Sequence, residues 1–445
     1  NRRGGHDPQG PSEGSARVSR GGTFGGWDKA SQSNSMAFSP RTPGTRTYHL
    51  GFRVVLSWVV GDSKQQVGSA VAKPTNAAPP LAVAPFDADQ AKAHQEAWAK
   101  HLGVPVEKEV KLPGGEKMTF MLIPPGEFMM GSSVDEIDAA TNAVRTVTPS
   151  DTVFNVLRNY ILAQGPQHKV VISRPFWLGK CEVTRGQFRQ FINTSKYRTD
   201  AEKSGKGLGY KDGQFVESPE FIWSANLGFE VEPNDQHPVV NVSWNDASAF
   251  SEWLSQREDA TCRLPTEAEW EFACRAGTTT NWSFGDNDAI GGQYAHCSSS
   301  SMKGTDSVGQ KSPNNFSLYD THGNVREQCH DWYGRYSTEL ATDPVGPETG
   351  KVRVVRNGGF NVSTAAMRSA RRLSFPQSYC DCFTGFRVAM TIDTAQLVRN
   401  DGSSQRGEEP LLTNPTTLTG HDKYIQELSF SPTERCSHPR LEIER

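Results

Sequence analysis

No stretch of this 445-residue chain is apolar over the length of a membrane-spanning helix. The longest apolar run, residues 54–60, has only the length of a strand. The net charge is −3 and no long basic or acidic run occurs, which argues against a nucleic-acid or membrane-surface partner held by charge. The eight cysteines lack paired spacing, so they predict neither a zinc site nor a disulfide framework. These absences leave a loop-rich globular chain that is long enough for two or three domains.

Residues 263–277 (RLPTEAEWEFACRAG) predict a short helix with defined ends. Thr266 and Glu269 have the spacing of a capping box, in which each side chain accepts a backbone N–H of the other residue. Pro265 prevents the helix from starting earlier, and Gly277 offers the left-handed turn that ends it.

Other local patterns indicate an α+β fold with little regular structure. Capping boxes at Thr184 with Gln187, and in weaker form at Ser243 with Asp246, predict two further helices. Residues 118–131 contain two strand-like runs around a Pro-Gly turn and predict a β-hairpin. The remaining sequence favours short strands and long turns.

An internal repeat divides the chain. Residues 17–24 (RVSRGGTF) recur as residues 353–360 (RVVRNGGF), and residues 49–55 (HLGFRVV) recur as residues 383–389 (FTGFRVA). Both pairs occur in the same order and bracket polar stretches of similar length. We therefore predict that residues 1–58 are the closing segment of one domain and that a complete copy follows.

Composition suggests the other boundaries. Residues 59–105 contain an Ala/Pro-rich linker and, from 87 to 101, good helix formers that predict one exposed helix. The complete domain is predicted over residues 106–392, followed by a polar tail over 393–445. Within the tail, residues 418–432 resemble the opening of a WD repeat, and a polar tail with chance similarity is the alternative.

The motif at 263–277 and the strand-turn-strand opening at 118–131 together resemble the formylglycine-generating enzyme family, also called sulfatase-modifying factors. The resemblance covers residues 106–392. It implies the C-type-lectin-like fold, a small twisted sheet wrapped by long loops. The activity that it implies is oxidation of a sulfatase cysteine to formylglycine.

The strongest functional pattern lies in residues 315–327 (NFSLYDTHGNVRE). Asp320 and Glu327 offer carboxylate oxygens, and Gly323 and Val325 offer backbone carbonyls around a tight turn, a set of hard ligands that suits Ca²⁺. The family resemblance implies a calcium site at the same four positions, and we predict that they bind calcium. The alternative is an Asx-type turn with Glu327 exposed to solvent. A second calcium site of the family is not expected, because His296 replaces an oxygen donor there.

The oxidase chemistry of the family implies two cysteines whose thiolates bind copper(I). The matching segment, residues 358–372, contains no cysteine, and the hydroxyl of Ser363 is neither a soft ligand nor a thiolate. Copper is therefore not expected. Cys380 and Cys382 lie one residue apart in the next loop; we interpret them as ordinary thiols, with a soft-metal pair as the alternative.

Arg368 and Arg372 are predicted to hold loop carbonyls or carboxylates, with contact to a substrate as the alternative. His237 is predicted to have a structural role at a strand entry. The missing cysteine pair favours a non-oxidase binding or interaction module with a protein or peptide partner. Two alternatives stay open: a formylglycine-generating oxidase, and an iron-dependent sulfoxide-synthase-like enzyme. The latter needs a His-rich helical domain that this sequence does not contain. Whether the protein is an enzyme is left open; the activity of the family would be that of an oxidoreductase.

Overall fold

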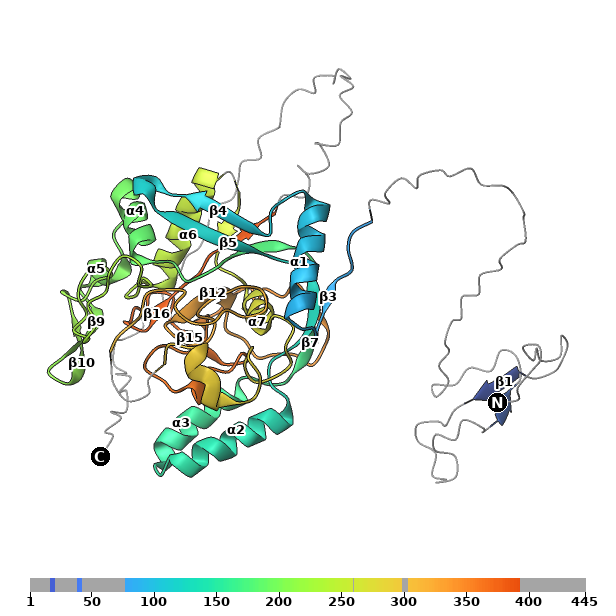
Figure 1. Cartoon of the computed structure of the whole chain (residues 1–445). Helices are drawn as coiled ribbons and strands as arrows, with labels where there is room; N and C mark the ends of the chain where they lie inside the picture. Colours follow the sequence, from blue (N-terminus) through green and yellow to red (C-terminus); the bar gives the residue numbers. More distant parts are fainter. Residues whose placement is uncertain (1–16, 21–37, 42–76, 259, 298–302, 393–445) are drawn as a thin grey trace, which may run out of the picture. The chain divides into compact units, whose positions relative to one another are not determined.

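The computed structural model describes most of the chain in two separate units, Asn1–Thr75 and Asn76–Arg445 (Figure 1). The described residues are 17–20, 38–41, 77–258, 260–297 and 303–392. In the first unit, β1 (Arg17–Arg20) pairs with β2 (Phe38–Arg41) in antiparallel register. The WD-like segment at 418–432 lies outside the described residues, as does most of the predicted remnant at 1–58.

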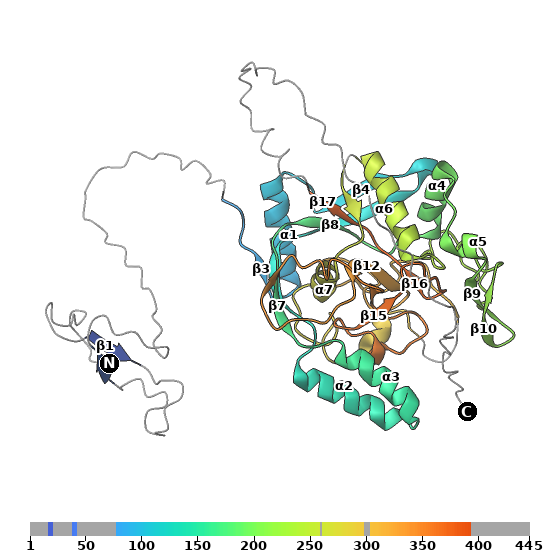
Figure 2. The same ribbon diagram turned by 180° about the vertical axis from the view of Figure 1, so that it is seen from behind.

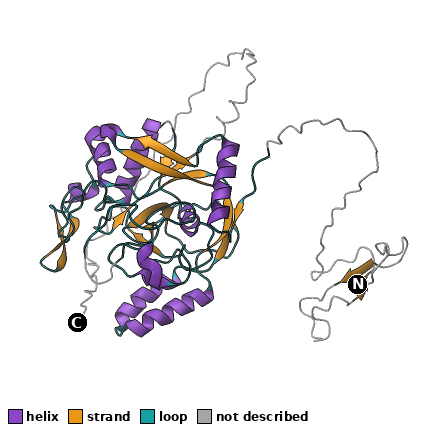
Figure 3. Cartoon of the chain, in the orientation of Figure 1, coloured by secondary structure: helices purple, strands orange, loops and turns teal. Residues whose placement is uncertain are grey.

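Small sheets and short helices make up the described part of the second unit, which confirms the predicted α+β fold (Figure 3). One sheet has the order β11 (Cys262–Arg263), β17 (Ala389–Thr391), β8 (Phe176–Gly179), β5 (Lys117–Ile123), β4 (Glu107–Lys111). A second has the order β15 (Arg372–Phe375), β14 (Arg353–Arg356), β12 (Arg326–Trp332), β16 (Thr384–Gly385). A third has the order β13 (Ala341–Thr342), β7 (His168–Ile172), β6 (Gly126–Met130), β3 (Ala82–Val83), and β9 (Gly207–Lys211) pairs with β10 (Gln214–Ser218).

The helices lie around these sheets, and one of them lies among them (Figures 1 and 2). The α-helices are α1 (Ala88–Leu102), α2 (Val134–Val147), α3 (Asp151–Leu162), α4 (Arg185–Ser195), α5 (Asp200–Ser204), α6 (Trp244–Glu258) and α7 (Glu267–Arg275). The short 3₁₀ turns are η2 (Pro113–Gly115), η3 (Asp288–Gln293) and η4 (Thr364–Ala366). No helix in the described ranges is both long and apolar enough to cross a bilayer.

Helix α7 is the central helix, and all of its residues are buried. The capping box of Thr266 and Glu269 is confirmed, with both backbone bonds formed. The left-handed residue at the helix end is Ala276, one position before the predicted Gly277, and Gly277 also has a positive φ. Because α7 is enclosed on every side, its carboxylates need charged partners inside the protein.

Two arginines from the second sheet provide those partners. Arg356 Nη1 lies 3.1 Å from Glu267 Oε1, and Arg356 Nη2 lies 2.6 Å from Glu271 Oε2. Arg372 donates two bonds to Glu267 and one to the carbonyl of Gly334. Arg368 donates to the side-chain oxygen of Gln164. The predicted structural role of Arg372 is confirmed, and these buried ion pairs fix α7 against β14 and β15.

The capping boxes predicted for two other helices are also confirmed. Thr184 caps α4 and Ser243 caps α6, each with the reciprocal bond from the residue three positions on. Helices α4 and α6 pack through an aromatic cluster in the core that includes Phe188, Phe191 and Phe250. Local capping therefore sets where these helices begin, and apolar burial sets where they dock.

Two sequence predictions are wrong. The strands β5 and β6 exist, but they do not form a hairpin: β5 pairs with β4 and β8, whereas β6 pairs with β7 and β3. Pro124 and Pro125 separate them and offer no N–H donors for a tight hairpin turn.

The helix predicted as exposed, α1, is instead half buried. Ala91, Gln95, Trp98 and Leu102 lie on one buried face at helical spacing, and Gln95 Nε2 donates to the carbonyl of Leu122 at 2.8 Å. The polar Gln95 interrupts the apolar pattern, which hid the buried face from sequence reasoning.

Candidate functional site

The loop with the four predicted calcium ligands runs into β12 and is buried. Glu327 is fully buried, so the alternative of a solvent-exposed Glu327 is wrong. Gly323 has a φ of +117°, and a Cβ there would lie 2.5 Å from the carbonyl oxygen of His296. Asp320 also has a positive φ, 57°. These left-handed conformations let several backbone carbonyls of the loop point toward the same side of the loop.

The carbonyls of Asp320, Gly323 and Val325 converge on one nitrogen, Asn357 Nδ2. The three O···N distances are 3.0, 2.9 and 3.0 Å. The other atom of the same amide, Oδ1, accepts the N–H groups of Gly323 at 2.8 Å and Gly358 at 2.7 Å. We call the three carbonyls of Asp320, Gly323 and Val325 the carbonyl ring. The side chain of the residue directly after β14 therefore holds the loop from its centre.

Glu327 has a different partner. Arg387 binds its carboxylate with two contacts, Nε to Oε2 at 2.5 Å and Nη2 to Oε1 at 2.7 Å, and Trp270 Nε1 donates to Oε2 at 2.8 Å. Burial alone would lower the pKa of Arg387, but the adjacent Glu327 outweighs it and the net shift is upward. This bidentate pair ties β12 to the strand entry before β17, and the hydrogen bond from Trp270 ties β12 to α7.

Two more carboxyl groups lie close to this ion pair. Burial, and then the charges of Asp320 and Glu327, raise the pKa of Glu182 well above its usual range. Burial raises the pKa of Asp320 to about 6, although the Gly309 N–H that it accepts acts in the opposite direction. The site therefore contains more carboxyl groups than Arg387 alone can neutralise, and the fold favours protonation of Glu182.

The residues as arranged do not fit calcium. Ca²⁺ needs six to eight oxygen ligands at about 2.3–2.6 Å. The carbonyl ring already accepts hydrogen bonds from Asn357, and both oxygens of Glu327 are used by Arg387. The structure thus brings three of the predicted ligands together around an amide and places the fourth in an ion pair. Calcium at Asp320, Gly323, Val325 and Glu327 stays a prediction that requires Asn357 to withdraw.

The segment matched to the second calcium site of the family, residues 294–297, packs against the same loop. The backbone carbonyl of His296 accepts Asn324 N–H at 2.8 Å, and its ring Nε2 lies 3.0 Å from the carbonyl of Gly304. His296 therefore supports the loop. In the described part of the chain, no group of three His, Cys, Asp or Glu side chains is arranged so that it could hold a metal ion.

The segment at 358–372 lies at the surface where η4 begins. Ser363 is exposed, and Thr364 Oγ1 lies 3.5 Å from Cys297 Sγ. Sequence reasoning missed Cys297, because 67 residues separate it from Thr364 and nothing in its local sequence indicates the contact. One thiol thus borders the segment in which the family resemblance implies two.

The seven cysteines in the described ranges are all free thiols. Cys382 is buried and Cys380 is half-buried, and burial, the largest cause, raises the pKa of both thiols. A raised pKa disfavours the thiolate that binds copper or attacks a substrate. This supports the interpretation of the pair as ordinary thiols.

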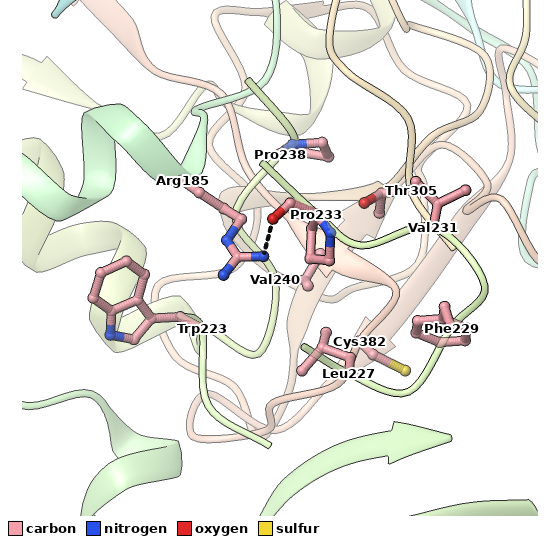
Figure 4. Close-up of a pocket in the computed structure, with 10 residues that line it drawn as sticks. All are labelled: Arg185, Trp223, Leu227, Phe229, Val231, Pro233, Pro238, Val240, Thr305 and Cys382. Carbon is pink, nitrogen blue, oxygen red and sulfur yellow. Dashed lines mark hydrogen bonds between the residues drawn. The ribbon is translucent and has the colours of Figure 1, made fainter. Parts of the chain in front are cut away.

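Cys382 also lines the small cavity drawn in Figure 4. The cavity measures about 10 Å³, and its other lining residues include Phe229, Pro233 and Val240. Arg185 Nη1 donates to the Pro233 carbonyl at 3.1 Å across one wall (Figure 4). A space of this size holds at most about one water molecule, so it is a packing gap.

A larger cavity of about 250 Å³ lies beside α7 and contains an unusual acid. Its lining includes His168, Glu267, Asp331, Tyr336 and Arg372. Burial, and then the neighbouring Glu267, raise the pKa of Asp331 to about 8, although its carboxylate accepts the Glu267 N–H at 2.8 Å. The fold therefore favours the protonated form of Asp331.

We expect Asp331→Asn to stabilise the domain at high pH only. The unfolded carboxyl titrates near 3.8, so wild-type stability falls as the pH rises from there through about 8. The asparagine avoids this loss, and its advantage should grow from almost none at pH 4 to on the order of 5 kcal/mol at pH 9. Urea unfolding at both pH values measures it, with the exposed Asp138→Asn as control. An equal effect of Asp331→Asn at both pH values would contradict the assigned titration.

Comparison with known proteins finds a matching family model, curated relatives and a similar solved structure. The family model described as the sulfatase-modifying factor enzyme 1-like domain matches residues 107–392. The formylglycine-generating enzyme of Thermomonospora curvata is 32% identical over 266 residues, which are 51% of this chain and 85% of that protein. The inactive C-alpha-formylglycine-generating enzyme 2 of Mus musculus is 32% identical over 206 residues, 38% of this chain and 62% of that protein. The structure of PvdO from Pseudomonas aeruginosa covers 64% of this chain and 98% of its own at 22% identity, with a TM-score of 0.49.

Proposed function

This chain belongs to the sulfatase-modifying factor family, and from that premise we propose that its domain is a non-oxidase binding module. The observation that carries the proposal is the absence of cysteine from residues 358–372, where the resemblance implies the copper-binding pair. The mouse relative is itself named as inactive, and the proposal gives this chain the same lack of oxidase activity. The described thiols support it, because burial favours the protonated form of Cys380 and Cys382.

We place the partner-binding surface on the aromatic residues that flank the same segment. Phe360, at its start, lies 5.1 Å from Phe229 and 5.3 Å from Phe383, measured between ring centroids. Phe215 on β10 lies 5.1 Å from Phe383 and is 38% exposed. Arg326 stacks on Phe383 at 5.1 Å. Phe360 and Phe383 are buried, so the accessible part of this aromatic cluster is Phe215 with the half-buried Phe229. Accessible aromatic side chains beside an arginine are typical of protein-binding surfaces, so the proposed partner is a protein or peptide with apolar side chains.

The oxidase stays the alternative, and Cys297 is the observation in its favour. Its thiol lies beside Thr364, on the border of the segment that would carry the pair. An oxidase would need a second thiolate to hold copper(I) with it. In the described structure the neighbour that Cys297 contacts is a hydroxyl.

A copper(I) competition titration tests the proposal. We expect this protein to take no copper(I) from a chromophoric chelator under conditions in which the Thermomonospora curvata enzyme removes it stoichiometrically. The reason is that one half-buried thiol cannot supply the two soft ligands that copper(I) prefers. Stoichiometric removal that is lost in Cys297→Ser would contradict the proposal and favour the oxidase.

A further inference from the structure

We propose that the side-chain amide of Asn357 is a built-in replacement for a cation at the centre of the carbonyl ring. The ring consists of three backbone oxygens from a single loop, and all three are directed at one nitrogen. This inference is independent of whether the domain is an oxidase or a binding module, because it concerns only what holds the loop.

The geometry resembles a coordination shell more than a set of ordinary amide hydrogen bonds. The three oxygens lie within 0.1 Å of the same distance from Asn357 Nδ2, at 2.9–3.0 Å. An amide nitrogen carries only two hydrogens, so three acceptors exceed its donors. Asn357 is 1% exposed, and its surroundings are buried, so the ring needs a positive centre supplied by the protein or by an ion.

The backbone at Asn357 supports a role for its side chain. Its φ is +67°, in the left-handed region that favours glycine. The internal repeat has glycine at the matching position: Arg20-Gly21-Gly22 aligns with Arg356-Asn357-Gly358. At this position the second copy of the repeat therefore has a carboxamide where the first copy has no side chain.

A neutral amide can take the place of a cation in the carbonyl ring because the charge of Glu327 is already neutralised. Arg387 already neutralises Glu327 with two contacts, so the ring faces no unpaired Glu327 charge. Asn357 Oδ1 is fixed by the N–H groups of Gly323 and Gly358, which orients Nδ2 toward the ring. A cation could enter only by displacing a side chain that is held at both ends.

The direct test is Asn357→Gly, measured by thermal unfolding with chelator and with calcium. In chelator the variant should melt below the wild type, because three buried carbonyls lose their donor. Calcium, held by the three ring carbonyls with water as its other ligands, should then raise the Tm by roughly 5–10 °C at a concentration about 100 times Kd, by binding the native state. The wild type should not respond, and magnesium should not replace calcium, since Mg²⁺ demands smaller, octahedral sites.

Two further variants separate the donor role from general damage to the loop. Asn357→Asp keeps the shape but directs a carboxylate oxygen at the three carbonyls, so its Tm should fall. Asn315→Asp, at a half-buried asparagine of the same loop that donates only to the Ala276 carbonyl, should change the Tm much less. An Asn357→Asp protein as stable as the wild type would overturn the proposal. So would a calcium response in the wild type that Glu327→Gln abolishes, or an Asn357→Gly protein that calcium leaves unchanged.

Discussion

Glu327→Gln should lower the free energy of unfolding by about 3–5 kcal/mol, the usual cost of removing one partner of a buried ion pair. The glutamine removes the negative charge and one of the two acceptor oxygens of residue 327, while the guanidinium of Arg387 stays charged and fully buried. The remaining acceptors of Arg387 are then the single amide oxygen and the carbonyls of Gly179 and Tyr319. The glutamine also weakens the acceptor for Trp270 Nε1, which connects the loop to α7. Urea unfolding followed by tryptophan fluorescence measures the change.

A matched control is Glu109→Gln, which removes the same charge from an exposed pair. Lys117 and Glu109 lie 3.1 Å apart with side chains 56% and 44% exposed. Such a pair contributes at most about 1 kcal/mol. If both variants lose the same stability, burial of the Glu327–Arg387 pair does not have the importance that we assign to it.

The features that the sequence predicted well are local ones. The caps at Thr184, Ser243 and Thr266 each depend on two residues three positions apart, so the spacing alone is sufficient. The pairing of β5 and β6 with strands of different sheets depends on distant segments, and no local pattern specifies it. Helices α2 and α3 were missed entirely, although Ser133 begins α2 with a capping box.

In the candidate site, too, the local features were predicted and the long-range contacts were not. The loop at 315–327 was located from its residues, and its carbonyls do converge. Their partner Asn357 lies 32 to 37 residues further along the chain, and Arg387 lies 60 residues from Glu327. One signal could have indicated Asn357: the repeat has Gly21 at the same place, so the difference between the two copies marks an added side chain.

We also expect this protein to have no formylglycine-generating activity. Conversion of a cysteine to formylglycine by this family is implied to require two thiolates that bind copper(I) in the segment at 358–372. This chain has Ser363 and Thr364 there, whose hydroxyls neither bind copper(I) nor ionise at neutral pH. The expected activity is therefore zero above background, not a partial loss.

The most direct measurement incubates the protein with copper, oxygen and a peptide that carries the Cys-x-Pro-x-Arg motif of sulfatases. Mass spectrometry then detects the aldehyde product, with the Thermomonospora curvata enzyme as the positive control. We predict that no peptide is converted while the control converts it. Aldehyde formed above background, and lost in Cys297→Ser, Cys380→Ser or Cys382→Ser, would contradict the non-oxidase account and show that thiols outside the segment at 358–372 carry the reaction.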